Sequence, residues 1–169
     1  PSVFATSETW VGIVATTCLA LTILVKDNLM AMRVTFGMMC VAFVLVAISA
    51  WFKQLDIVSP FAFMVMCGIG LYIPYVAFHT SVFERLIAAA RMPSNLGFLM
   101  YMADSIGYLG YAVVIVAKTW MKNDVELLPY FQWILLITAS SSILCLIAAL
   151  LYFQRALANR PNVPAAEER

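Results

Sequence analysis

Asp104 is the residue whose type and position could most readily do chemistry. It is the one acidic residue in an otherwise uncharged, mainly apolar run from residue 95 to 117. If that run is a helix, Asp104 lies about 13 Å along it, close to the middle of a bilayer. A carboxylate at that depth is costly unless it faces protein or a water-filled cavity. We therefore take Asp104 as a candidate for binding a proton, a cation or a cationic group.

Three tyrosines fall on the same helical face as Asp104. Tyr101, Tyr108 and Tyr111 stand at positions i−3, i+4 and i+7 from it. One interpretation is a path for a solute, a proton or a cation, lined by the carboxylate and these hydroxyls. The other is a buried aspartate that is hydrogen-bonded to a Tyr or His of a neighbouring helix, with the tyrosines acting in packing or at the interface. The residues alone leave both interpretations open.

A second polar stripe precedes the first in the chain. Tyr72, Tyr75 and His79 are spaced i, i+3, i+7 around Pro74, so they share one side of a helix and could face Asp104. A single histidine is more often a hydrogen-bonded packing residue than a proton relay, which makes His79 a secondary candidate. The predicted substrate or ion path comprises Asp104, Tyr101, Tyr108, Tyr111, Asn95, Tyr72, Tyr75 and His79.

Charged residues gather just after this second stripe. Glu84, Arg85 and Arg91 could form a cytoplasmic gate as an ion pair, or they could anchor the helix to lipid phosphates. Anchoring is the simpler of the two roles.

Gly68, Gly70 and Pro74 interrupt the apolar run that carries the second stripe. Membrane helices tolerate such residues where neighbours satisfy the freed backbone groups, and such residues often mark a kink. We expect the helix to flex there.

Signatures of enzymes and of metal sites are missing from the sequence. It has no HExxH, GxSxG, GxxxxGK[ST] or GxGxxG motif and a single histidine. Its four cysteines lie inside apolar runs without CxxC spacing, as buried small hydrophobes do. A net charge of +1 without a basic stripe does not favour nucleic acid as a partner. We expect no catalytic residue, no cofactor and no metal.

The elements that must position these residues are membrane helices. Apolar residues make up 64% of the chain and charged residues 11%, far from the balance of a soluble domain. Several runs between charges reach the roughly 20 residues that span a bilayer. The sequence predicts an all-α transmembrane bundle, 1–154, and a disordered cytoplasmic tail, 155–169. Its five helices are expected at about 9–25, 30–52, 57–83, 95–117 and 127–154.

The distribution of positive charge predicts an orientation. With five helices, all the arginines and Lys26 fall on one side, against Lys53, Lys118 and Lys122 on the other. The positive-inside rule makes the arginine side cytoplasmic, so the chain would start outside a bacterial inner membrane and end in the cytoplasm. An external start without a signal peptide leads us to expect a preceding helix bundle of the same protein.

Short segments within residues 30–117 resemble a known group of proteins. They read Tyr72-Ile-Pro-Tyr75, Phe83-Glu-Arg-Leu-Ile-Ala88, Asn95-Leu-Gly-Phe98, Tyr101-Met-Ala-Asp104 and Gly107-Tyr-Leu-Gly110. They look like an uncharacterised family of bacterial multi-pass membrane proteins related to the major facilitator superfamily. That resemblance implies a twelve-helix transporter fold of which this chain would supply helices eight to twelve.

Our leading hypothesis is the C-terminal part of a secondary transporter that moves an unidentified small solute by alternating access, with Asp104 binding a proton, a cation or a cationic group. Such carriers bind their solute near the midplane between two helix bundles. The alternative is a non-transporting accessory or assembly protein that keeps a transporter-like fold.

Overall fold

The computed structural model describes residues 2–90, 95–120 and 127–158, and every regular element in those ranges is helical. The elements in chain order are α1 (Ser2–Thr22), α2 (Asn28–Gln54), α3 (Pro60–Ala77), the π-helical turn η1 (Phe78–Val82), α4 (Phe83–Ala90), α5 (Leu96–Trp120) and α6 (Leu127–Ala158).

Five stretches of the described chain are long and apolar enough to cross a membrane. They correspond to α1, α2, the continuous helix from α3 into α4, α5 and α6. The predicted all-α class with about five transmembrane helices is confirmed, and the chain has the make-up of a multi-pass membrane protein.

Three helix bounds differ from the predicted ones by more than three residues, and one of them is the end of the third helix, which lies at Ala90 rather than at 83. The first helix begins at Ser2 rather than residue 9, because a single charged residue, Glu8, does not end a helix. The last helix continues past residue 154 to Ala158, so the expected tail does not begin at 155. Residues 159–169 of that tail lie outside the described part.

Local sequence signals set the turns of the bundle. The Asp27 carboxylate caps α2 by accepting a hydrogen bond from the Met30 amide at 3.0 Å. Ser59 caps α3 in the same way, and Pro60 occupies the first turn, where its missing N–H has no helical partner. At the end of α2, Asp56 has a φ of 52°, and the Ile57 amide donates to the Phe52 carbonyl at 3.1 Å. This arrangement is a Schellman motif, which reverses the chain between α2 and α3.

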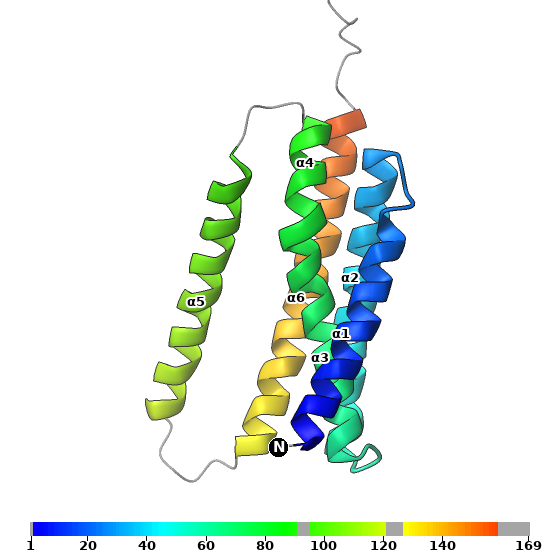
Figure 1. Ribbon diagram of the computed structural model, residues 1–169. Helices are drawn as coiled ribbons and strands as arrows, with labels where there is room; N and C mark the ends of the chain where they lie inside the picture. The colour runs from blue at the N-terminus through cyan, green and yellow to red at the C-terminus, as the bar shows by residue number, and fades with distance from the viewer. Residues whose placement is uncertain (1, 91–94, 121–126, 159–169) are drawn as a thin grey trace, which may run out of the picture.

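The bundle is built around α2, which packs on α3 and α6, while α1 packs on α3 (Figure 1). Two of the three clusters of buried side chains in the described residues contain most of its core. One contains Met32, Phe36, Met39, Ala77, Val82 and Leu146, and the other contains Val46, Ala50, Phe63, Cys67, Leu135 and Ala139. Both clusters hold the helix from α3 to α4 in place, and that helix carries His79.

Two glycines of α3 lie where helices approach most closely. A Cβ at Gly68 would come within 2.6 Å of Val11 Cγ2 of α1. A Cβ at Gly70 would meet the Val46 side chain and would lie 2.6 Å from the Ala42 carbonyl oxygen of α2. Close approach through small residues is the usual way in which membrane helices pack. The structure thus gives both glycines a packing role, while the flexing predicted from the sequence remains a prediction.

The helix from Pro60 to Ala90 is irregular at one place. Pro74 is buried inside α3, and a single π-helical turn, η1, follows it directly after Ala77. Proline removes one hydrogen bond of the helical ladder and crowds the carbonyl four residues earlier. Isolated π turns are rare and are frequent at functional sites. His79 lies inside this turn.

Helix α5 stands apart from the rest of the bundle, as Figure 1 shows. None of its residues is buried, although its sequence is strongly apolar. It lies beside the helix that carries His79, and this arrangement places Asp104 next to the irregular turn.

Candidate functional site: a histidine–aspartate pair at a cavity

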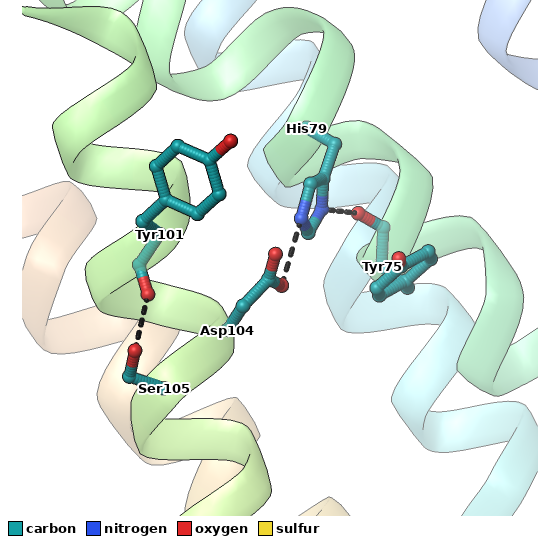
Figure 2. Close-up of polar contacts among 5 residues, drawn as sticks. All are labelled: Tyr75, His79, Tyr101, Asp104 and Ser105. Atoms are coloured by element: carbon teal, nitrogen blue, oxygen red, sulfur yellow. Dashed lines mark hydrogen bonds and ion pairs between the residues drawn. The ribbon is translucent and has the colours of Figure 1, made fainter.

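His79 and Asp104 lie in direct contact between η1 and α5 (Figure 2). The distance from His79 Nε2 to Asp104 Oδ1 is 3.0 Å, and the two side chains are 24% and 37% exposed. The other ring nitrogen, Nδ1, lies 2.9 Å from the carbonyl oxygen of Tyr75. The imidazole is thus held on both sides, by the backbone of its own helix and by the carboxyl group of the next.

The two contacts restrict where the protons lie. A backbone carbonyl oxygen only accepts hydrogen bonds, so a bond to Tyr75 requires a proton on Nδ1. Nε2 then accepts from a protonated Asp104 or, in an imidazolium, donates to the Asp104 carboxylate. In the other neutral tautomer Nε2–H donates to the carboxylate and Nδ1 makes no bond to Tyr75. In each of these states one proton lies between Nε2 and Oδ1.

Aromatic rings continue along the same side of the helix. The rings of Tyr75 and His79 have centroids 4.5 Å apart, and those of Tyr72 and Tyr75 are 6.4 Å apart. The predicted stripe of Tyr72, Tyr75 and His79 is therefore one contiguous surface, and its histidine end contacts Asp104.

The pair lies at the wall of a cavity of about 880 Å³. That volume is within the range of small-molecule sites. The lining comes from η1, α5 and neighbouring helices and consists of Tyr75, Phe78, His79, Phe83, Ala103, Asp104, Ile106, Gly107, Tyr108, Tyr111 and Ser142. A polar pair in a largely aromatic and apolar wall is the arrangement typical of a binding site.

A second cavity, of about 680 Å³, lies between α1 and α3. Its lining is Phe4, Ser7, Glu8, Val11, Gly12, Met64, Gly68, Leu71, Tyr72 and Tyr75. Tyr75 lines both cavities. Glu8 is not among the site residues predicted from the sequence, because the first helix was expected to begin at residue 9. The sequence feature that could have indicated Glu8 is that it is a single acidic residue in the apolar stretch from Val3 to Thr22.

Comparison with known proteins gives a family but no activity. A family model described as "Family of unknown function (DUF5690)" matches residues 1–156. This chain belongs to that family. Neither a curated protein nor a solved structure shows a significant match. The family description names no relation to the major facilitator superfamily, so that relation stays a prediction for this DUF5690 member.

The other predicted site residues of the DUF5690 chain fall in different places. Tyr108 and Tyr111 line the larger cavity with Asp104, whereas Tyr101 is exposed and is not among the lining residues. Asn95 lies at the start of α5, where its Oδ1 accepts a hydrogen bond from the Phe98 amide at 3.3 Å. This contact caps the helix, and the proposed place of Asn95 in a path stays a prediction.

Two of the charged residues predicted as a gate or anchor, Glu84 and Arg85, are not among the lining residues of either cavity. Glu84 is exposed in the first turn of α4, and Arg85 follows it, partly buried. Arg91 lies outside the described residues. A gating or anchoring role for the three residues remains a prediction.

Asp104 is hydrogen-bonded to a histidine of a neighbouring helix. It also lines a cavity together with two tyrosines. The packing and the path interpretations of Asp104 both remain predictions. The arrangement can bind and release a proton at a place where a solute could also bind.

Proposed function

We propose that this chain is the C-terminal part of a secondary-transporter-like membrane protein. In this proposal the protein moves a small solute by alternating access and couples that movement to protons through His79 and Asp104. The observation that supports it most is the contact of 3.0 Å between these side chains at the wall of a cavity between spanning helices.

A change in protonation would change how α5 is held. With the proton present, Nε2 and Oδ1 share it and the two helices are joined. When the proton leaves while Nδ1 still donates to Tyr75, the lone pair of Nε2 faces a carboxylate oxygen and the contact becomes repulsive. Release of the proton would therefore loosen α5 from η1. Because no residue of α5 is buried, little apolar packing opposes that movement.

The environment of the pair also fits a carrier. Ionisable residues within membrane spans usually face a cavity or the interior of a bundle and mark paths for substrates or protons. Carriers use irregular helices next to such sites, and His79 lies in a π turn just after Pro74. The uncovered side of α5 would face a second helix bundle of the same protein. In the resemblance to the major facilitator superfamily, this chain corresponds to helices eight to twelve of that arrangement.

The proposal is tested by comparing solutes in cells that express the full-length protein or its Asp104→Asn variant at matched levels. Untargeted mass spectrometry of cells and medium should reveal at least one small solute whose distribution depends on the wild-type protein. Asp104→Asn should reduce that effect at least tenfold, because an amide cannot take up the shared proton. Ser105→Ala, on the next residue of α5, should leave it unchanged. Wild-type behaviour of Asp104→Asn would show that the carboxyl group has no coupling role.

The uncovered α5 also favours a second candidate, a non-transporting accessory or assembly protein whose α5 binds a separate partner. That candidate predicts a stoichiometric partner after purification in mild detergent. It also predicts that Asp104→Asn weakens the association without changing the distribution of any solute.

A further inference from the structure

The cavity between α1 and α3 contains an acid that the proposed function does not use. Glu8 lies within the spanning part of α1, and its side chain is exposed along the cavity. Within the described ranges the structure records no hydrogen bond or ion pair for that side chain. The rest of the lining carries no charge.

An unpaired carboxylate is costly against lipid hydrocarbon. A carboxylate in a spanning segment is accommodated where it faces water, a bound cation or further protein. The cavity has a volume of about 680 Å³, enough for a small organic molecule. A bound cation would also compensate the charge.

Aromatic faces line the cavity together with this carboxylate. The side chains of Tyr72 and Tyr75 are 45% and 57% exposed, and their ring centroids are 6.4 Å apart. A cation is attracted to an aromatic ring within about 6 Å of its centroid, so one cation in the cavity can be within range of both rings. A carboxylate combined with tyrosine rings is chemically suited to an organic ammonium group, which offers charge, N–H donors and an apolar body.

We propose that this cavity binds the protonated amine of a small organic solute. Glu8 neutralises the ammonium charge, Tyr72 and Tyr75 contact it through their ring faces, and the apolar part of the solute packs along Val11, Met64 and Leu71. Tyr75 also lines the larger cavity, so an amine bound here lies next to the His79–Asp104 site. The proposal depends on the proposed function only for the fate of the amine after binding.

The test measures binding to the purified full-length protein in detergent. The probe is 2-phenylethylamine, and its uncharged counterpart of similar size is 2-phenylethanol. A ligand that binds only the folded state raises the unfolding temperature in a concentration-dependent way. We expect the amine to raise it and the alcohol to have no effect at equal concentration.

Two variants locate the site. Glu8→Gln keeps the size of the side chain and removes its charge, so it should weaken amine binding at least tenfold. Gly12→Leu fills the cavity, because nothing lies within 4 Å of a Cβ built at Gly12, and it should have a similar effect without a change of charge. Asp56→Asn is the matched control, since it removes one negative charge in the turn between α2 and α3, outside both cavities. It should bind the amine like the wild type.

The outcomes separate this proposal from the proposed function. Equal binding of amine and alcohol, no binding of the amine, or unchanged amine binding in both Glu8→Gln and Gly12→Leu would overturn the assignment of the cavity. The proposed function would stand even without an amine site in this cavity if Asp104→Asn abolished the redistribution of some solute. Amine binding that depends on Glu8, in a protein that redistributes no solute, would support the cavity and count against transport.

Discussion

His79 Nε2 lies 3.0 Å from Asp104 Oδ1, although 25 residues separate the two in the chain. The contact joins the π turn η1 to α5, a helix without a single buried residue. A helix with so little packing depends on its specific polar contacts for its position. The pair is therefore the natural place from which to perturb both the structure and the proposed function.

A double-mutant cycle on this pair should show a favourable coupling energy. We expect the free energy of unfolding to fall in His79→Ala and in Asp104→Ala, and to fall in the double variant by less than the sum. Interhelical hydrogen bonds in membrane proteins give coupling of about 0.6 to 1.7 kcal/mol, which sets the expected size. The free energy of unfolding of each variant is measured by titrating the protein in mixed micelles with a denaturing detergent, and the coupling energy follows from the four values. Combining His79→Ala with Ser105→Ala should instead be additive, and an additive His79–Asp104 cycle would mean that the contact contributes nothing to stability.

The glycines of α3 and α5 should respond differently to alanine. Gly70→Ala places a Cβ against the Ala42 carbonyl of α2, which cannot move aside, so it should destabilise the protein by about 1 to 3 kcal/mol. Gly68→Ala meets only side-chain atoms of Val11 and should cost less. Gly107→Ala and Gly110→Ala, with nothing within 4 Å, should be neutral or slightly stabilising because alanine favours the helix. Unfolding temperatures measured in detergent rank the four variants by their loss of stability. Equal effects at all four positions would contradict close packing of α2 and α3.

Asp56 should tolerate glycine and asparagine but not valine. Its φ of 52° is in the left-handed region, where a β-branched residue is strained by about 1 to 2 kcal/mol. Asp56→Gly relieves any strain and loses only the Lys53–Asp56 ion pair, whose carboxylate is 86% exposed and which therefore contributes little. Thermal unfolding of the Asp56→Gly, Asp56→Asn and Asp56→Val variants tests this order. A fully stable Asp56→Val would show that the turn does not need a left-handed residue.

Pro74→Ala should make the π turn exchange its amide hydrogens more slowly. Alanine restores an N–H to the helical ladder one turn before η1 and removes the clash of the proline ring, so the segment Phe78–Val82 should open less often. Hydrogen-exchange mass spectrometry of peptides that cover this segment measures the change. Pro60→Ala, in the first turn of α3, is the control, because that position has no helical partner for its N–H. Exchange in Phe78–Val82 that is the same in both variants would show that Pro74 does not control the turn.

The sequence by itself determined the helices and most of their ends. Long apolar runs can satisfy their backbone in a membrane only as helices, and this requirement does not depend on neighbouring elements. Asp27 before α2 and the pair Ser59-Pro60 before α3 are local signals that act within one turn. Asp104 was likewise recognisable from the sequence, because a carboxylate deep inside an apolar spanning run requires a polar partner or water, whichever segment supplies it.

Only the tertiary structure decided what these residues contact. The sequence could place His79 and Asp104 on helical faces but could not rotate those faces toward each other, since their orientation depends on a π turn and on the close packing of α3 at Gly68 and Gly70. Glu8 is a candidate binding residue only because α1 packs on α3, which places Glu8 and Tyr72 in the lining of the same cavity. Local signals set where helices begin and end, whereas contacts between distant segments arise from packing that no single run of residues encodes.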